Sequence, residues 1–180
     1  MQNTQSASWT PAQIDLWARI TRHDLELGQP LGFSRRMARD KGWSHGFTLA
    51  VIGEYRRFCF LAVASERQIT PSEEVDEVWH MHLTYSRDYW DIWCREVLRA
   101  PLHHDPTQGS RADQARFRNQ YAATLAFYET FFGPPDAKYW PATHDRFRDK
   151  ARFRTIDTDR WLLLPRPSRF FQWLQGGTKL

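Results

Sequence analysis

Apolar residues recur every three or four positions along most of this chain, which is the spacing of one face of an α-helix. Capping residues and helix breakers separate these stretches. Thr-Pro-Ala-Gln at 10–13 has the spacing of a capping box, and Gly-Pro-Pro at 133–135 ends the last long stretch. No stretch alternates in the two-residue period of a strand, so we predict an all-α fold, a single-domain bundle of about five to seven helices. The main predicted helices span residues 10–25, 34–42, 44–64 and 111–132. Residues 73–98 are also predicted to be helical, either as one straight helix or as a broken one.

The stretch at 44–64 is apolar on almost every side, and a helix of this kind belongs at the centre of a bundle. Its charged residues, Glu54, Arg56 and Arg57, form the predicted polar face. These charges make it unsuited to cross a bilayer, and no other stretch reaches the roughly 18 apolar residues that a membrane helix needs. The N-terminal sequence also lacks the basic start and apolar run of a signal peptide. We therefore expect a cytoplasmic location.

The length of 180 residues suits one domain with its own core. We expect a flexible N-terminus at 1–9, a helical domain at 10–160 and an extended aromatic C-terminal arm at 161–180. The arm either packs on the bundle or docks on a protein partner or a membrane surface. The second alternative rests on Arg166 and Arg169, which flank aromatic residues as in peripheral membrane segments.

The composition is rich in apolar and aromatic residues, at 41% and 15% of the chain, and includes nine tryptophans, which excludes a disordered protein. The net charge is +4. The basic residues are spread along the chain without a compact block, so nucleic acid is not an expected partner. Cys59 and Cys94 form no CxxC pair, and we expect both to be reduced and buried.

Four of the seven histidines lie in two segments, Trp-His-Met-His at 79–82 and His-His-Asp-Pro at 103–106. If residues 73–98 formed one straight helix, His80 and His82 would point in directions about 200° apart and could not hold one ion. The helix would end about 27 Å from His80, because each residue adds about 1.5 Å to its length. The second segment would begin only beyond that end. A straight helix would therefore make a poor metal site.

A bend at residues 82–86, where threonine and serine are modest helix formers, would change this geometry. The second half of the stretch could then fold back and bring His103, His104 and Asp105 towards His82. Imidazole and carboxylate groups suit Zn²⁺ or non-haem Fe²⁺, and a site with three protein ligands leaves a position open for water.

The candidate ligands and the side chains expected around them come from both segments. Asp76 lies one turn before His80, where it can hold the far ring nitrogen. Each residue also has a plain structural alternative: a hydrogen-bonded core residue for His82, a surface pair for Asp76 with His80, and a structural turn for the second segment. The candidate ligands are His80, His82, His103, His104 and Asp105, with Asp76, Tyr85 and Tyr89 around them.

The first histidine segment belongs to a longer motif, Val75-Asp76-x-x-Trp79-His80-x-His82, followed by Tyr89 and Cys94. With FSRRMARDKGWS, EYRRFCFLAV and PLHHDPT, it resembles the bacterial branch of the glycine-rich domain-containing protein-like family over roughly residues 30–140. Plant members of that family have a proline where residues 84–86 read Thr-Tyr-Ser, and an Asp-Cys pair where residues 93–94 read Trp-Cys. The resemblance implies a helical domain and assigns it no catalytic residues.

Two functions are consistent with these patterns. The first is a metal-binding domain, extending to a metal-dependent enzyme that acts on a small molecule or a peptide. The second is a non-enzymatic interaction module, which would bind a protein partner or a membrane surface through its aromatic faces and the arm at 161–180. The sequence has no nucleophile elbow, phosphate-binding loop or dinucleotide fingerprint, and no base is predicted beside Cys94.

Overall fold

The computed structural model describes residues 9–65, 67–105, 110–148, 159, 160 and 162. The chain divides into two compact units, residues 1–147 and 148–180, and the helices described below belong to the first. The predicted flexible N-terminus (1–9) and C-terminal arm (161–180) lie outside the described residues, apart from Trp9 and Leu162.

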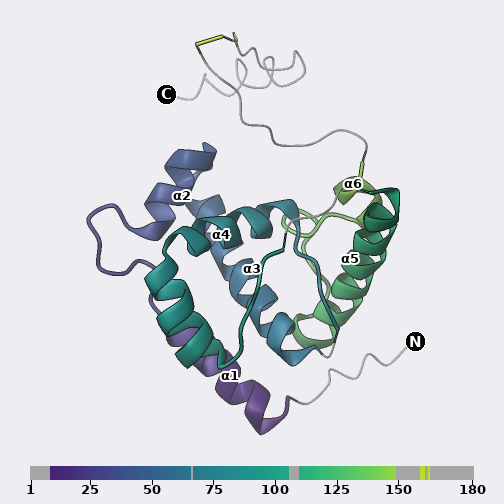
Figure 1. Ribbon diagram of the computed structural model, residues 1–180, viewed down its shortest axis with the longest axis horizontal. Coiled ribbons are helices and arrows are strands. Elements are labelled where there is room, and N and C mark those ends of the chain that lie inside the picture. Colours follow the sequence, from purple (N-terminus) through teal and green to yellow (C-terminus); the bar gives the residue numbers. More distant parts are fainter. Residues whose placement is uncertain (1–8, 66, 106–109, 149–158, 161, 163–180) are drawn as a thin grey trace, which may run out of the picture. The chain divides into compact units, whose positions relative to one another are not determined.

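Seven helices and no strand occur within the described part of the chain, which confirms the all-α prediction. The helices pack into one bundle (Figure 1). None of them is long and apolar enough to span a bilayer. The helices are α1 (Pro11–Arg22), α2 (Phe33–Lys41), α3 (His45–Ala64), α4 (Glu73–Thr84), the π-helix η1 (Asp88–Leu98), α5 (Arg111–Phe132) and the short α6 (Thr143–Arg146).

The long helix α3 runs through the middle of the bundle, as predicted, and contacts α1, α2, α4, α5 and η1 (Figure 1). Ser44 caps its N-terminus by accepting a hydrogen bond from the Phe47 N–H. The predicted polar face was wrong at Glu54, which is only 6% exposed. The Glu54 carboxylate accepts hydrogen bonds from the Tyr128 hydroxyl at 2.8 Å and the Trp140 indole at 2.9 Å. Partners from elsewhere in the fold therefore keep this charge inside the bundle.

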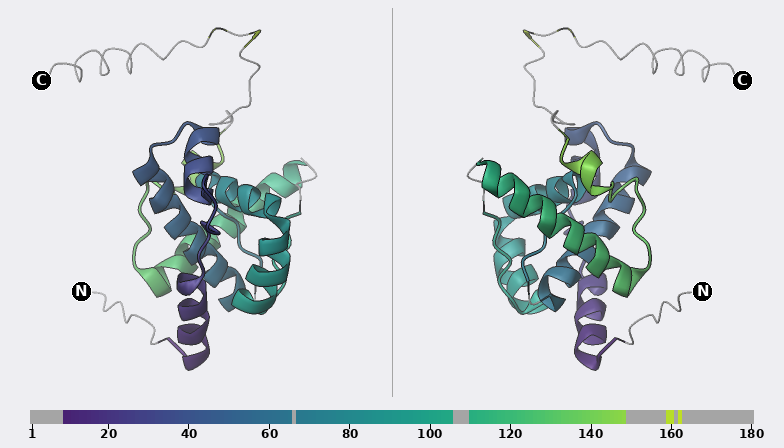
Figure 2. Two further views of the ribbon diagram at one scale, coloured as in Figure 1. Left: turned by 90° about the vertical axis from the view of Figure 1, so that its left-hand side faces the viewer. Right: turned by 90° about the vertical axis from the view of Figure 1, so that its right-hand side faces the viewer.

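Aromatic side chains fill the space between α1, α3 and α5. Trp9 stacks on Phe60 of α3, with 4.7 Å between ring centroids, and meets Trp17 of α1 and Phe132 of α5 edge-on. Figure 2 shows α5 crossing obliquely over one side of the bundle. Among the described tryptophans, only Trp90 is exposed. Most of the aromatic surface is therefore used in packing the bundle.

The helical stretch over 73–98 is broken, so the alternative with a bend is the one that the structure has. α4 ends at Thr84, Tyr85 has a non-helical backbone (φ −87°, ψ 54°), and η1 begins at Asp88. The π-helix η1 ends at Leu98, and Arg99, which follows it, adopts the left-handed conformation (φ 58°). From there the chain runs back towards α4 (Figure 1). The segment at 100–105 therefore lies beside the helix that carries the first histidine pair.

Candidate metal centre

Three side chains bring cation-binding groups to one place: Asp76 and His80 from α4, and His104 from the segment after η1. One ligand atom from each lies within 4.8 Å of the other two. Asp76 and His80 are four residues apart, so the helix places them one turn apart on the same face. The chain reversal after η1 supplies His104, whose Nε2 lies 2.9 Å from Asp76 Oδ1.

Neighbouring rings hold the His104 imidazole in place. Its ring centroid lies 4.5 Å from that of Trp79 and 4.4 Å from that of His80. Trp79 is buried and gives the group an apolar wall, whereas His80 is exposed. The side chains of His104 and Asp76 are 19% and 27% exposed. The donor group is thus supported from behind and accessible from solution.

The chemistry of these donors fits a divalent transition-metal ion. Two imidazole nitrogens and one carboxylate oxygen are the ligands found in catalytic Zn²⁺ sites and in the facial triad of non-haem Fe²⁺ enzymes. Three protein donors leave further coordination positions for water or a substrate. By donor type and by spacing, Asp76, His80 and His104 could therefore hold either ion.

The hydrogen bond between His104 and Asp76 sets the electrostatics of the group. This bond is the main reason that the pKa of His104 lies above its ordinary value of 6.5, and burial acts in the opposite direction. A histidine binds a metal ion in its neutral form, so protons and metal should compete for His104.

We expect the Asp76→Asn variant to lower the pKa of His104 towards 6.5, because an amide carries no charge to stabilise the imidazolium. Since the folded-state pKa is raised, the stability contributed by this pair is fully present below about pH 6.5 and is lost as the pH rises through the pKa of folded His104. An NMR titration of the histidine ring protons measures the shift. The matched control is Asp105→Asn, because Asp105 has the smallest of the effects that raise this pKa. Equal shifts in the two variants would contradict the assignment.

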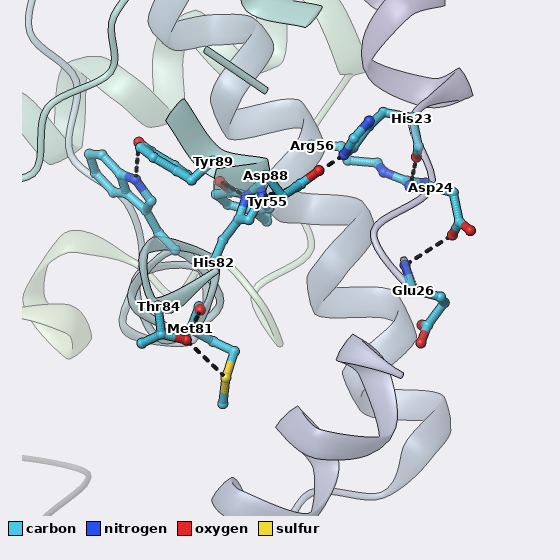
Figure 3. Close-up of polar contacts among 11 residues, drawn as sticks. His23, Asp24, Glu26, Tyr55, Arg56, Met81, His82, Thr84, Asp88 and Tyr89 are labelled. Atoms are coloured by element: carbon cyan, nitrogen blue, oxygen red, sulfur yellow. Dashed lines mark hydrogen bonds and ion pairs between the residues drawn. The ribbon is translucent and has the colours of Figure 1, made fainter. Parts of the chain in front are cut away.

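The second histidine of α4 lies in the core instead. His82 is fully buried, and both ring nitrogens are hydrogen-bonded: Nδ1 lies 2.8 Å from the Tyr55 hydroxyl and Nε2 lies 2.8 Å from Asp88 Oδ2 (Figure 3). The same carboxylate oxygen lies 3.2 Å from Nε2 of His23, the residue that caps the C-terminus of α1. The Asp88 carboxylate of η1 thus joins His82 of α4 to His23 at the end of α1, and His82 connects it to Tyr55 of α3.

The direction of these hydrogen bonds follows from their chemistry. A carboxylate only accepts, so the Nε2–H of His82 donates to Asp88, and Nδ1 accepts from the Tyr55 hydroxyl. Burial lowers the pKa of His82 and keeps the ring neutral. Burial alone would raise the pKa of Asp88, but its interactions with His82 and His23 outweigh this and lower it. The network therefore leaves neither ring nitrogen of His82 available to an ion.

The bend thus brings the second histidine segment to His80 and Asp76, not to His82. His103 and Asp105 are exposed and do not belong to the donor group, although both adjoin His104 in the chain. The His103 ring packs on Trp90, with 5.4 Å between centroids.

The two tyrosines predicted to surround the site lie in different places. Tyr85 ends α4 and its ring packs on Phe33, at 5.4 Å between centroids. Tyr89 is fully buried and accepts a hydrogen bond from the Trp79 indole at 2.7 Å. Its own hydroxyl donates to the backbone carbonyl of Leu102. Tyr89 therefore connects α4 to the segment that carries His104, whereas Tyr85 belongs to the packing of α2.

Two features of the site were missed from the sequence. Asp76 was expected behind the ligands, but its carboxylate is itself a member of the donor group. His23 and Asp88 were not identified as partners of His82, because they lie 59 residues before it and six residues after it, on other helices. The signal that could have found Asp88 was an acidic residue directly after the expected bend, where it can reach back to the end of α4.

Comparison with known proteins identifies a distant similarity. The chain is 24% identical over 131 residues to glycine-rich domain-containing protein 1 of Arabidopsis thaliana, an alignment that covers 69% of this chain and 16% of the plant protein. No family model matches the chain, and no solved structure matches it. This chain is therefore distantly similar to one part of a larger glycine-rich domain-containing protein.

Proposed function

We propose that this chain is a metal-binding helical domain in which Asp76, His80 and His104 hold a Zn²⁺ or Fe²⁺ ion. The observation that supports the proposal most strongly is the convergence of one carboxylate and two imidazoles within 4.8 Å of one another. They come from two segments that are 24 residues apart at their closest, and the break at Tyr85 and the reversal at Arg99 bring them together. A bound ion of this kind acts as a Lewis acid and lowers the pKa of a coordinated water.

We further propose that the domain is a metal-dependent enzyme that acts on a small molecule or a peptide. Three protein donors are the number that catalytic sites use, because further positions stay open for water and substrate. The exposed His80 leaves one side of the donor group open to a substrate. Trp79, buried behind His104, excludes water from the other side.

The family suggested by the sequence motif is part of this proposal. We infer that the chain belongs to the bacterial branch of the glycine-rich domain-containing protein-like family. The distant similarity to the Arabidopsis protein supports this inference. The placement of the motif residues Asp76 and His80 in the donor group also supports it. Metal binding by both side chains would require their spacing of four residues on the helix.

The alternative, an interaction module, has one observation in its favour. Trp90 and Ile92 on η1 are each 40% exposed, and large apolar side chains at a surface often mark a contact site. The arm at 161–180, which was the other basis for this reading, lies outside the described residues apart from Leu162. The donor group therefore supports metal binding better than these two side chains support docking.

Protein purified without chelator should contain close to one equivalent of a transition metal, and EDTA should lower its melting temperature. His104→Ala should weaken binding of added Zn²⁺ by about 100-fold or more, because it removes one of three donors. Elemental analysis and titration calorimetry measure these two quantities.

The matched control is His103→Ala, which removes the exposed neighbouring imidazole and should leave metal content unchanged. Metal below about a tenth of an equivalent, with unchanged melting in EDTA, would refute the proposal. Equal loss of metal in the His103 and His104 variants would refute the assigned donors.

A further inference from the structure

A chain of hydrogen bonds connects the apolar wall of the candidate metal centre to the segment that carries His104. The Trp79 Nε1–H donates to the Tyr89 hydroxyl over 2.7 Å, and this hydroxyl donates to the backbone carbonyl of Leu102. Leu102 lies two residues before His104, and the Trp79 ring contacts the His104 ring directly. These four residues form a closed ring of contacts across the chain reversal after η1.

The winding of η1 places Cys94 on the same face as Tyr89. Cys94 follows Tyr89 by five residues, which in an α-helix would place the two side chains about 140° apart. In a π-helix the backbone hydrogen bonds join residues five apart, so such residues lie nearly one above the other. The Leu102 backbone and the Tyr89 side chain both lower the pKa of the Cys94 thiol, against the larger effect of burial. The hydrogen bond that holds the Leu102 backbone is that of the Tyr89 hydroxyl.

Both side chains stay in the protonated form. Burial raises the pKa of Tyr89 far above its ordinary value, and burial also raises the pKa of Cys94. The Tyr89 hydroxyl therefore donates to the Leu102 carbonyl throughout the physiological pH range. The contact is a fixed part of the fold and does not depend on a titration.

We propose that Tyr89 is a positioning residue for the metal centre, which holds the segment before His104 through its hydrogen bond to Leu102. The inference rests on the proposed metal-binding function. Tyr89 touches no donor atom and acts through Leu102, by fixing the backbone two residues before His104. Without this bond the ion itself would have to order the segment, and the entropy cost of that ordering would weaken binding.

The test is the Tyr89→Phe variant, which keeps the buried ring and removes the hydroxyl. We expect its affinity for Zn²⁺ and Co²⁺ to fall about 10–100-fold, the usual effect of losing a residue that orients a ligand. In metal-free protein we expect faster amide hydrogen exchange at residues 102–104. Titration calorimetry, the visible absorption spectrum of the Co²⁺ form and NMR-detected exchange measure these effects.

The matched control is Tyr128→Phe, which removes another buried hydroxyl with two hydrogen-bond partners, Glu54 and Arg57, away from the metal centre. It should lose a similar amount of stability but keep its metal affinity. Equal loss of affinity in the two variants would mean that Tyr89 acts only through stability, and would overturn the proposal.

The two proposals fail in different ways. If the wild-type chain binds neither ion but Tyr89→Phe accelerates exchange at residues 102–104, metal binding is refuted and the positioning of the segment stands. If the wild-type chain binds both ions and Tyr89→Phe binds them equally well, the positioning role is refuted. Should Tyr89→Phe fail to fold, Trp79→Phe removes the indole N–H that donates to the Tyr89 hydroxyl, and unchanged affinity in that variant overturns the proposal.

Discussion

The His82→Ala variant should lose about 4 kcal/mol of unfolding free energy, because it leaves the buried Tyr55 hydroxyl without its acceptor and the buried Asp88 carboxylate with His23 as its remaining partner. The residues Tyr55 and Asp88 are 0% and 6% exposed, so water cannot readily replace the lost imidazole. The missing ring would also leave a cavity among Phe33, Tyr89 and Trp93, whose rings surround it.

Urea unfolding followed by circular dichroism, in EDTA to remove any metal, measures this loss. The melting temperature should fall by roughly 10 °C, at about 2–4 °C per kcal/mol for a chain of this size. The matched control is His80→Ala, two residues earlier on the same helix but exposed, which should change stability by less than about 0.5 kcal/mol. Similar losses in the two variants would mean that the buried network does not stabilise the fold.

His80 and His82 show what helix periodicity alone can predict, namely the direction of each side chain. Residues two apart on a helix point in nearly opposite directions, so His80 and His82 were not expected to hold one ion on a straight helix. In the structure His80 lies in the donor group and His82 in the buried network. The weak helix formers at 84–86 indicated the bend, and the structure has it at Tyr85. Local rules were sufficient here because each concerns residues within one or two turns of each other.

The partners of each histidine could not be predicted in the same way. Tyr55 precedes His82 by 27 residues, and His104 follows Asp76 by 28. Which of them meet depends on how α3 crosses α4, and on where the chain turns after η1. The π-helical winding of η1 could not be predicted from the sequence either. Tyr89 and Cys94 are five residues apart, and they share a face only when the backbone hydrogen bonds join residues five apart instead of four.

Glu54 was placed on the polar face of α3 because charged residues are mostly exposed. The structure corrects this, since its carboxylate accepts hydrogen bonds from Tyr128 on α5 and from Trp140 in the following segment. Arg57, one turn later on α3, donates to the other carboxylate oxygen at 2.7 Å. Trp140 is 2% exposed and Tyr128 also 2% exposed, so their donors have no access to water. This carboxylate joins α3 to α5 and to the segment that follows it.

Glu54→Ala should therefore cost about 3–4 kcal/mol of unfolding free energy, because it leaves the Tyr128 hydroxyl and the Trp140 indole N–H buried without an acceptor. Urea unfolding measures the loss. The matched control is Glu129→Ala, next to Tyr128 on α5 but exposed, which should cost less than about 0.5 kcal/mol. If Glu54→Ala proved as stable as Glu129→Ala, the carboxylate would be dispensable and apolar packing alone would hold α5 against α3. Neither variant should alter metal affinity, because both positions lie outside the donor group.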